Sequence, residues 1–500
     1  MPARGCLQSS ELEPWRNGQE EDRSVRGVPP PGGPHDTQPP ILPEPLASDP
    51  PAPPNPRPAA PAPTPPHLPA GWRRLDAVAR GLMAARALRS VAQGALAADF
   101  VLFLRALHWQ PGTIGLLLTA SSLAGGVLGL AVGPISDRVG RRPFLLIYQA
   151  SLSACTLAVL ADPRGWLLAV AAVVFGYGLG ANGAAGPFAP AEQAWLARHV
   201  PASERGAVFS LNAAIGFWGM GVGSLIGGLV PRWAGALPGT RAYMPLFALT
   251  LALSVVNYRQ IAALREDPPA GAQGRPPHLT GAPPPAAAGD ASVSLPPAAE
   301  ARVRRQENRT LALLVASNAV NAVGIGLFAP LLPYWFSARY GVGPGAIGSI
   351  YGLTFILTGM ASIVTGQLVA RIGLVRAIVW VRLAGVLMLL AMPLMPTFGW
   401  AAVLYAARSV LNRGSVGARQ AFGVGIVRDQ RRGLASSLNN VSWSLPGAIG
   451  PGVGGYLMAL GSLSLPLYLA AAFQLAYAVL FGALFRRYEP AGTRRSPAAT

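Results

Sequence analysis

The chain has 500 residues, of which 51% are apolar and 12% are charged, about half the charged share of an average soluble protein. The net charge is +19, but the basic residues lie in the gaps between apolar runs, which is typical of a membrane protein and argues against a nucleic-acid partner. The two cysteines, Cys6 and Cys155, provide no disulfide framework or metal cluster.

Residues 1–72 are rich in proline, glycine, alanine and charge, so this end is predicted to be a disordered tail, as is the short end at 489–500. Between the tails lie twelve apolar runs of about 20 residues, a length that crosses a bilayer. A stretch rich in proline, alanine and glycine at 266–308 predicts a flexible linker between six-helix bundles at 73–265 and 309–488. The predicted runs are 82–106, 112–133, 143–161, 166–190, 206–230, 243–264, 311–336, 345–369, 373–394, 399–424, 433–459 and 464–485.

The two halves of the apolar region repeat each other. A shift of 233 residues maps Pro111–Gly115 onto Pro344–Gly348, and a shift of 227 maps Gly223, Gly227 and Gly228 onto Gly450, Gly454 and Gly455. Helical membrane proteins built from two similar halves usually bind a solute between them and alternate the open side. The sequence therefore predicts an all-α membrane protein with twelve transmembrane helices in two pseudo-symmetric bundles, and a transport function.

Arginines mark alternate gaps between the spans. They are frequent before the first span, in the second-to-third gap, in the linker and after the last span, and sparse in the opposite gaps. Because basic residues are retained on the cytoplasmic side, both termini and the linker are predicted to be cytoplasmic. The chain is expected to be a multi-pass protein of a bacterial cytoplasmic membrane.

A motif rich in glycine and charge lies between the second and third spans. Its glycines allow close helix approach and a tight turn. Its acid can face a helix N-terminus or an arginine, and this contact would keep the cytoplasmic side of the protein closed in one state. The second half has Ala370 in place of the acid, so this latch would be one-sided. Alternatively, the arginines only anchor the loop at the cytoplasmic side of the membrane, where basic residues are retained. The motif residues are Gly133, Asp137, Arg138, Gly140, Arg141 and Arg142.

This motif resembles the signature loop of the major facilitator superfamily at every polar position, and the layout of residues 75–488 agrees with that family. The resemblance implies a two-bundle fold and transport by alternating access. It also implies that Glu192, near the end of the fourth span, joins Arg138 in a charge network at the inner gate. The alternative is that Glu192 forms a salt bridge that only stabilises one bundle.

The fifth span carries Gly219-Met-Gly-Val-Gly223-Ser224-Leu-Ile-Gly227-Gly228, which resembles the antiporter motif of the same family but has Ser224 where the family has proline. The resemblance favours efflux. Small residues four apart also serve helix packing alone, which is the alternative explanation.

Asp99 lies in the first span, about 10 Å below its outer end by helix rise, and Glu192 is the other intramembrane acid. Acids at such depth are costly and mark functional sites, so both are candidate proton carriers. Asp99 could instead pair permanently with Arg105 or another arginine.

Polar residues at mid-span depth are candidates for the substrate path. Arg408, Asn412 and Arg413 are predicted to share one face of the tenth span, where Arg408 would bind an anion or balance Asp99. Asn212 and Asn439 are repeat partners. The candidates are Gln93, Asn212, Asn318, Asn321, Arg408, Asn412, Arg413 and Asn439.

No pattern of catalytic residues, metal ligands or phosphate-binding glycines is found, so no enzyme activity and no cofactor are expected. Energy for transport would come from a proton gradient. We expect a monomeric, proton-coupled exporter of small organic molecules in the lipid bilayer. The alternatives are uptake of a sugar or organic anion, and a sensor that does not transport.

Overall fold

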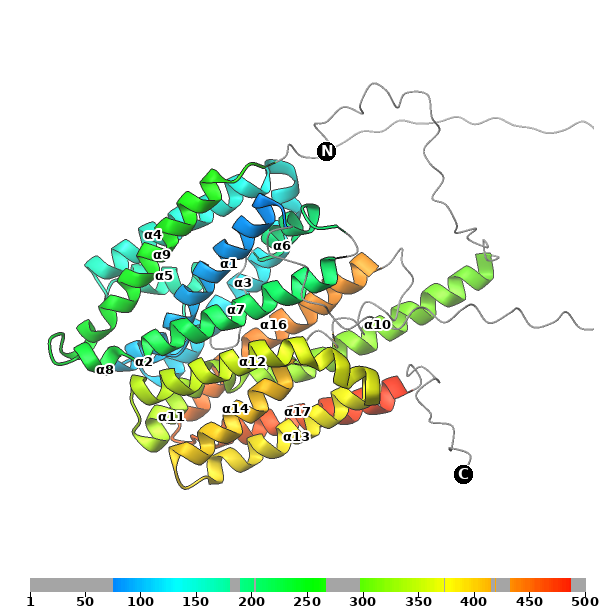
Figure 1. Cartoon of the computed structure of the whole chain (residues 1–500). Helices are drawn as coiled ribbons and strands as arrows, with labels where there is room; N and C mark the ends of the chain where they lie inside the picture. Colours follow the sequence, from blue (N-terminus) through cyan, green and yellow to red (C-terminus); the bar gives the residue numbers. More distant parts are fainter. Residues whose placement is uncertain are drawn as a thin grey trace, which may run out of the picture. The chain divides into compact units, whose positions relative to one another are not determined.

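The computed structural model describes residues 75–179, 189–201, 204–266, 297–372, 374–414, 419 and 432–486, which form helices and turns without any strand (Figure 1). The helices of the first half are α1 (Ala77–Ala97), α2 (Asp99–Ala106), α3 (Pro111–Val139), α4 (Arg141–Ala161), α5 (Trp166–Phe175), α6 (Ala189–Arg198), α7 (Arg205–Gly227), α8 (Val230–Trp233), η3 (Gly239–Tyr243) and α9 (Met244–Ala263). Those of the second half are α10 (Pro297–Gly326), η5 (Ala329–Leu331), α11 (Leu332–Tyr340), α12 (Pro344–Ile372), α13 (Leu374–Ala391), η6 (Met392–Leu394), α14 (Phe398–Gly414), α16 (Arg432–Ala459) and α17 (Leu465–Phe485).

Nine helical stretches within the described residues are long and apolar enough to cross a membrane. They correspond in order to nine of the twelve predicted spans. The other three predicted spans overlap α5, α14 and α16, and α6 lies mostly beyond the predicted end of the fourth span. Large apolar side chains such as Trp380, Leu387 and Trp400 are more than 60% exposed, as suits a surface covered by lipid. The prediction of an all-helical membrane protein is confirmed.

The linker is shorter than predicted, because α10 begins at Pro297 and not near residue 309. The segment that follows Pro297 consists mainly of alanine, arginine, glutamate and glutamine, which are strong helix formers. At the other end of the linker, Glu266 contacts the start of α4. Residues 297–308, predicted as the end of the linker, are therefore part of α10.

The first span of each half is broken, at positions that lie close together in the repeat but do not coincide. The first break separates α1 from α2 at Ala98, and the second separates α10 from η5 and α11 at residues 327–328. In the second half, Pro330 and Pro333 follow the break and cannot donate backbone hydrogen bonds. The first half has no proline there, and the first residue after its break is Asp99.

Glycines bring two helix pairs into backbone contact, α1 with α7 and α10 with α16. A Cβ atom at Gly223 would overlap the carbonyl oxygen of Val91, and one at its repeat partner Gly450 would overlap the backbone of Gly326. Ser224 donates a hydrogen bond to the Gly94 carbonyl at 3.1 Å. The glycine motif of the fifth span thus forms a packing seam in both halves, which supports the packing explanation of the motif.

The two bundles meet through α3 against α16 and through α12 against α7. At these contacts Gly115 lies against Gly455 and the Pro451 carbonyl, and Gly348 lies against Gly228. Gly348 is the repeat partner of Gly115, and Gly455 is the repeat partner of Gly228. If the two halves are exchanged, each of these two contacts therefore becomes the other. This relation confirms the predicted pseudo-symmetry. The contacts lie at the start of α3 and α12, which we name the far end; the opposite end, where α9 ends and α4 begins, is the linker end.

We expect Gly115→Val and Gly348→Val to open the far end to a similar extent, because each adds a side chain where the bundles touch by backbone. Overpacking of this kind costs about 1–3 kcal/mol, so the open population should rise roughly tenfold. A single cysteine placed at Thr119, which accepts a hydrogen bond from Gly452 across the interface, reports opening through its reaction with a membrane-impermeant maleimide. Gly125→Val is the control, because no atom lies within 4 Å of a Cβ there. An effect from only one of the two glycines would contradict their equivalence.

Candidate functional site

Asp99 is a buried acid without a partner. It is the first residue of α2, it is 1% exposed, and neither carboxylate oxygen has a hydrogen-bond partner among the residues that the structure describes. A Cβ atom at Gly227 of α7 would overlap its Oδ2 atom, so α7 covers the carboxyl group closely. An unpaired carboxylate in an apolar interior is strongly unfavourable unless it binds a proton or meets a cation in another conformation.

The expected alternative, a permanent pair of Asp99 with Arg105, is not formed in this conformation. The Arg105 guanidinium lies 5.2 Å from the ring centroid of Tyr334, on α11 of the other bundle. Arg408 does not balance Asp99 either, because it donates to Gln474 within the second bundle.

The second half shows that helix packing does not require an acid at this position. Gly227 lies against the Ala95 carbonyl and Asp99, and its repeat partner Gly454 lies against the Leu327 carbonyl and Leu331. Leu331 therefore occupies the place of Asp99 in an equivalent packing arrangement. Packing at this position therefore does not account for the acid in the first half.

Glu192 forms a buried ion pair with Arg89, a residue of α1 that the sequence analysis did not select. Glu192 is 3% and Arg89 is 6% exposed, and Arg86, nearly one turn earlier, interacts electrostatically with both. The expected partner, Arg138, has its side chain outside the described part of α3. Arg89 could have been found from the sequence, because an arginine inside a membrane span is itself a sign of a functional or structural charge pair.

The signature loop contacts the end of α9. Gly140 has φ +102° and ψ 146°, a conformation that side-chain-bearing residues rarely adopt, as the motif predicts. The Glu266 carboxylate accepts hydrogen bonds from the backbone N–H groups of Arg141 at 2.6 Å and Arg142 at 2.9 Å, and so caps the positive end of α4. The Arg142 side chain also donates to the Ala262 carbonyl.

These contacts place Arg141 and Arg142 within the first bundle, attached to α9. The surroundings of Gly133, Asp137 and Arg138 lie outside the part of the chain whose side chains are described. Their role in a gate remains a prediction.

Two buried arginines of the second bundle share one amide. Arg408 of α14 donates to Gln474 Oε1 of α17 at 2.9 Å, and Arg382 of α13 donates to the same oxygen at 3.3 Å. The Arg408 guanidinium lies 4.6 Å from the ring centroid of Phe328, and that of Arg382 lies 5.4 Å from the ring centroid of Tyr477. Cation–π contacts of this kind offset part of the cost of burying a charge.

No carboxylate neutralises these arginines among the described residues of the second bundle from α11 onward. Between residues 309 and 486 the sequence contains one acid, Asp429, which lies outside the described ranges. Arg382 and Gln474 were not selected from the sequence, because a contact between the ninth, tenth and twelfth spans leaves no local pattern. The pair of cations makes this part of the bundle a candidate site for an anion.

The expected common surface of Arg408, Asn412 and Arg413 is not formed. Asn412 donates to the Arg408 carbonyl at 2.9 Å and lies against Gly385 of α13. Arg413 lies 4.8 Å from the ring centroid of Phe355 on α12. Arg413 contacts α12 and not the neighbours of Arg408 and Asn412, because a step of five residues on an α-helix turns well away from a step of four.

The remaining path candidates comprise two asparagines in contact, two buried asparagines and Gln93. Asn318 Nδ2 donates to Asn439 Oδ1 at 2.9 Å and to Ser442 Oγ at 3.1 Å, so α10 and α16 are joined by a polar contact. Within the described part of the chain, Asn321 is fully buried with no hydrogen-bond partner for either amide atom, and Asn212 is buried with its Oδ1 unpartnered. Gln93 is half-buried on α1.

A model described as "Major Facilitator Superfamily" matches residues 82–417 and 314–500, which together cover most of the chain. The chain belongs to the Major Facilitator Superfamily. As a member, it is a multi-pass membrane transporter and not an enzyme. The signature loop and the two-bundle fold described above are therefore those of a facilitator protein.

Three relatives match shorter segments. A D-xylose transporter of Levilactobacillus brevis is 34% identical over 21% of this chain and 21% of its own length. A gallate transporter of Pseudomonas putida is 33% identical over 22% and 24%, and Multidrug resistance protein D of Escherichia coli (strain K12) is 35% identical over 16% and 20%. The matched segments thus span about a quarter or less of each relative.

Solved structures of facilitator proteins share the fold over nearly their whole length. The D-xylose–proton symporter superposes with a TM-score of 0.60 at 12% identity, covering 80% of this chain and 96% of that protein. The nucleoside transporter NupG superposes with a TM-score of 0.57 at 12% identity, covering 82% and 100%. At this identity the likeness concerns the fold alone.

Proposed function

We propose that this facilitator protein exports small organic molecules in exchange for protons, with Asp99 as the proton carrier. The observation that carries the proposal is the buried, unpaired carboxyl group of Asp99, at a position where the second half has Leu331. Its place beside the helix break gives it a route to solvent when the bundles move apart. Glu192 is the weaker proton candidate, because Arg89 already neutralises it.

The coupling follows from the cost of a buried charge. When the far end is closed, Asp99 is sealed against Gly227 and is most stable with a proton bound. When the far end opens, water reaches the carboxyl group and the proton exchanges. For net transport, the proton that Asp99 takes up from the far end leaves toward the linker end after the far end has closed, displaced by cargo that binds from that side, and the cargo leaves when the far end opens again. The linker end faces the cytoplasm in this proposal, as the arginine distribution indicates.

One finding supports export over uptake: one relative is named a multidrug resistance protein. The resemblance of the fifth span to the antiporter motif adds little, because its glycines form a packing seam in both halves. The test is cargo accumulation into inverted membrane vesicles from a panel of fluorescent organic compounds under an imposed pH gradient. Accumulation that collapses when the gradient is dissipated supports the proposal. Accumulation that is indifferent to the gradient contradicts proton coupling, and no flux of any compound through a folded protein would favour the non-transporting sensor.

The second candidate function is uptake of an organic anion. It is favoured by Arg382 and Arg408, which are buried without a carboxylate nearby in the described part of the second bundle. One relative is named a gallate transporter, and gallate is an aromatic carboxylate. An anionic cargo would supply the negative charge that Arg382 and Arg408 lack among the described residues.

The arginine pair provides the test of this second candidate. Uptake of a labelled aromatic carboxylate into intact cells should fall at least about tenfold in Arg408→Gln, since a charged hydrogen bond to a buried anion contributes about 1.5–3 kcal/mol. Arg339→Gln, an exposed arginine at the end of α11, is the matched control. Equal uptake in wild type and Arg408→Gln would exclude the anion site.

A further inference from the structure

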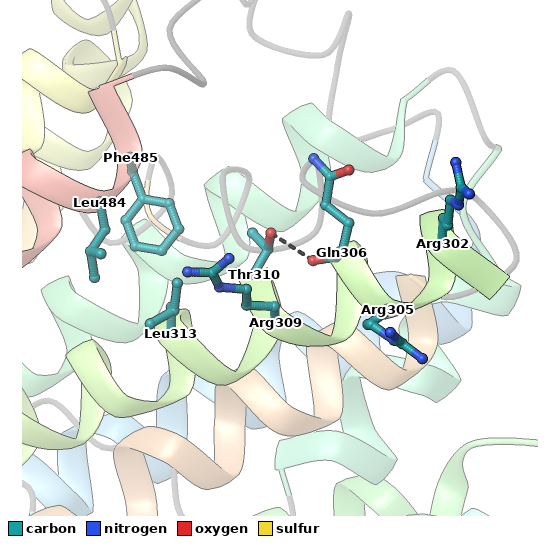
Figure 2. A pocket seen from close by; sticks show the side chains of 8 residues that line it. All are labelled: Arg302, Arg305, Gln306, Arg309, Thr310, Leu313, Leu484 and Phe485. Carbon is teal, nitrogen blue, oxygen red and sulfur yellow. Dashed lines mark hydrogen bonds between the residues drawn. The ribbon is translucent and has the colours of Figure 1, made fainter. Parts of the chain in front are cut away.

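A cavity of about 340 Å³ lies between the beginning of α10 and the end of α17, at the linker end of the second bundle. Figure 2 shows its lining side chains, which come from these two helices only. The volume falls in the lower part of the range of about 300–1,000 Å³ that is common for small-ligand sites. The lining residues are Arg302, Arg305, Gln306, Arg309, Thr310, Leu313, Leu484 and Phe485.

The cavity has an excess of positive charge. Arg302, Arg305 and Arg309 follow one another at steps of three and four residues, which places them on one face of α10, and all three are exposed. The described acids of α10, Glu300 and Glu307, do not line the cavity. Three guanidinium groups spaced along one face of α10 favour a ligand with a phosphate or another oxyanion.

The other part of the cavity wall is apolar. Leu313 and Leu484 are half-buried and Phe485 is buried, and Figure 2 shows Arg309 reaching toward Phe485. From Arg302 to Leu313 the helix rises about 16 Å, so the wall changes from cationic to apolar along α10. The apolar part coincides with the start of the seventh membrane span. A ligand that matches this gradient has an anionic head and an apolar tail.

We propose that this cavity binds an anionic phospholipid of the leaflet at the linker end, with its phosphodiester held by Arg302, Arg305 and Arg309 and an acyl chain against Leu313, Leu484 and Phe485. Basic cavities beside transmembrane helices are suited to such headgroups. The bound lipid anchors the part of α10 that follows the linker. This site is independent of cargo and proton coupling, so its test and the transport test can fail separately.

The experiment compares lipid binding by the full-length protein in detergent, measured by native mass spectrometry with phosphatidylglycerol and with phosphatidylcholine. We expect selective retention of phosphatidylglycerol, and loss of about fivefold in affinity for each arginine changed to glutamine. The variant Arg302→Gln/Arg305→Gln/Arg309→Gln should therefore lose roughly a hundredfold. Because the three side chains are exposed, this variant should melt at the wild-type temperature.

A charge-matched control separates a site from general attraction to a basic protein. Arg259→Gln/Arg265→Gln/Arg304→Gln removes three exposed arginines at the same end that do not line the cavity. It should retain phosphatidylglycerol as the wild type does. Equal loss in both triple variants would overturn the proposal, because binding would then follow net charge alone.

A second comparison tests the contribution of the acyl chain. Inorganic phosphate and glycerol phosphate should raise the melting temperature far less than phosphatidylglycerol, because they leave the apolar wall empty. If inorganic phosphate alone matched the lipid at equal concentration, the cavity would be a site for a small free anion and the lipid proposal would be wrong.

Discussion

Asp99→Asn is expected to abolish gradient-driven cargo accumulation while cargo exchange down its own gradient continues. Asparagine keeps the size of the side chain but cannot bind and release a proton, so the coupling step is lost and the cargo path is not. The measurement is accumulation in inverted vesicles at a fixed pH gradient, with counterflow of the same cargo in the absence of a gradient. Full accumulation by Asp99→Asn would show that Asp99 is not the proton carrier.

A matched variant for Asp99 comes from the repeat itself. Asp99→Leu gives the first half the residue that packs against Gly454 in the second half, where Leu331 holds the equivalent position. It should fold, and its melting temperature should equal or exceed that of the wild type, because an unpaired buried carboxyl group is removed. It should also lack proton coupling. A large loss of stability in both Asp99 variants would instead indicate a structural role.

The repeat is the part of the fold that the sequence predicted best. The two shifts of the sequence, 233 and 227 residues, match Gly115 with Gly348 and Gly228 with Gly455, and the structure shows these glycines as two equivalent interbundle contacts. A glycine marks a position without a side chain, where two helix backbones can approach each other, so the glycine spacing predicts these backbone contacts. The turn at Gly140 was predictable for the same reason.

The sequence was less informative about the breaks and the partners of charged residues. The break at Ala98 has no proline, and the following Asp99 does not by itself end a helix. Arg89 and Glu192 are 103 residues apart, and Arg382 and Gln474 are 92 apart, so nothing local connects them. The sequence shows which residues are costly to bury, but which of them form contacts with each other depends on the fold.

Breaking the ion pair between Arg89 and Glu192 is expected to cost about 3–5 kcal/mol of stability, because removing one partner leaves a buried charge uncompensated. Glu192→Gln should therefore melt at a clearly lower temperature in detergent. Glu204→Gln, an exposed acid at the start of α7, is the control and should melt as the wild type does.

The double variant Arg89→Leu/Glu192→Leu separates the two explanations of this pair. Removing both charges should restore most of the stability, since replacing a buried pair by apolar residues is often neutral or stabilising. If the pair only supports folding of the first bundle, the double variant should transport as the wild type does. If Glu192 belongs to the gate at the linker end, the double variant should fold and yet transport slowly. A double variant as unstable as Glu192→Gln would contradict the assumption that uncompensated charge causes the loss.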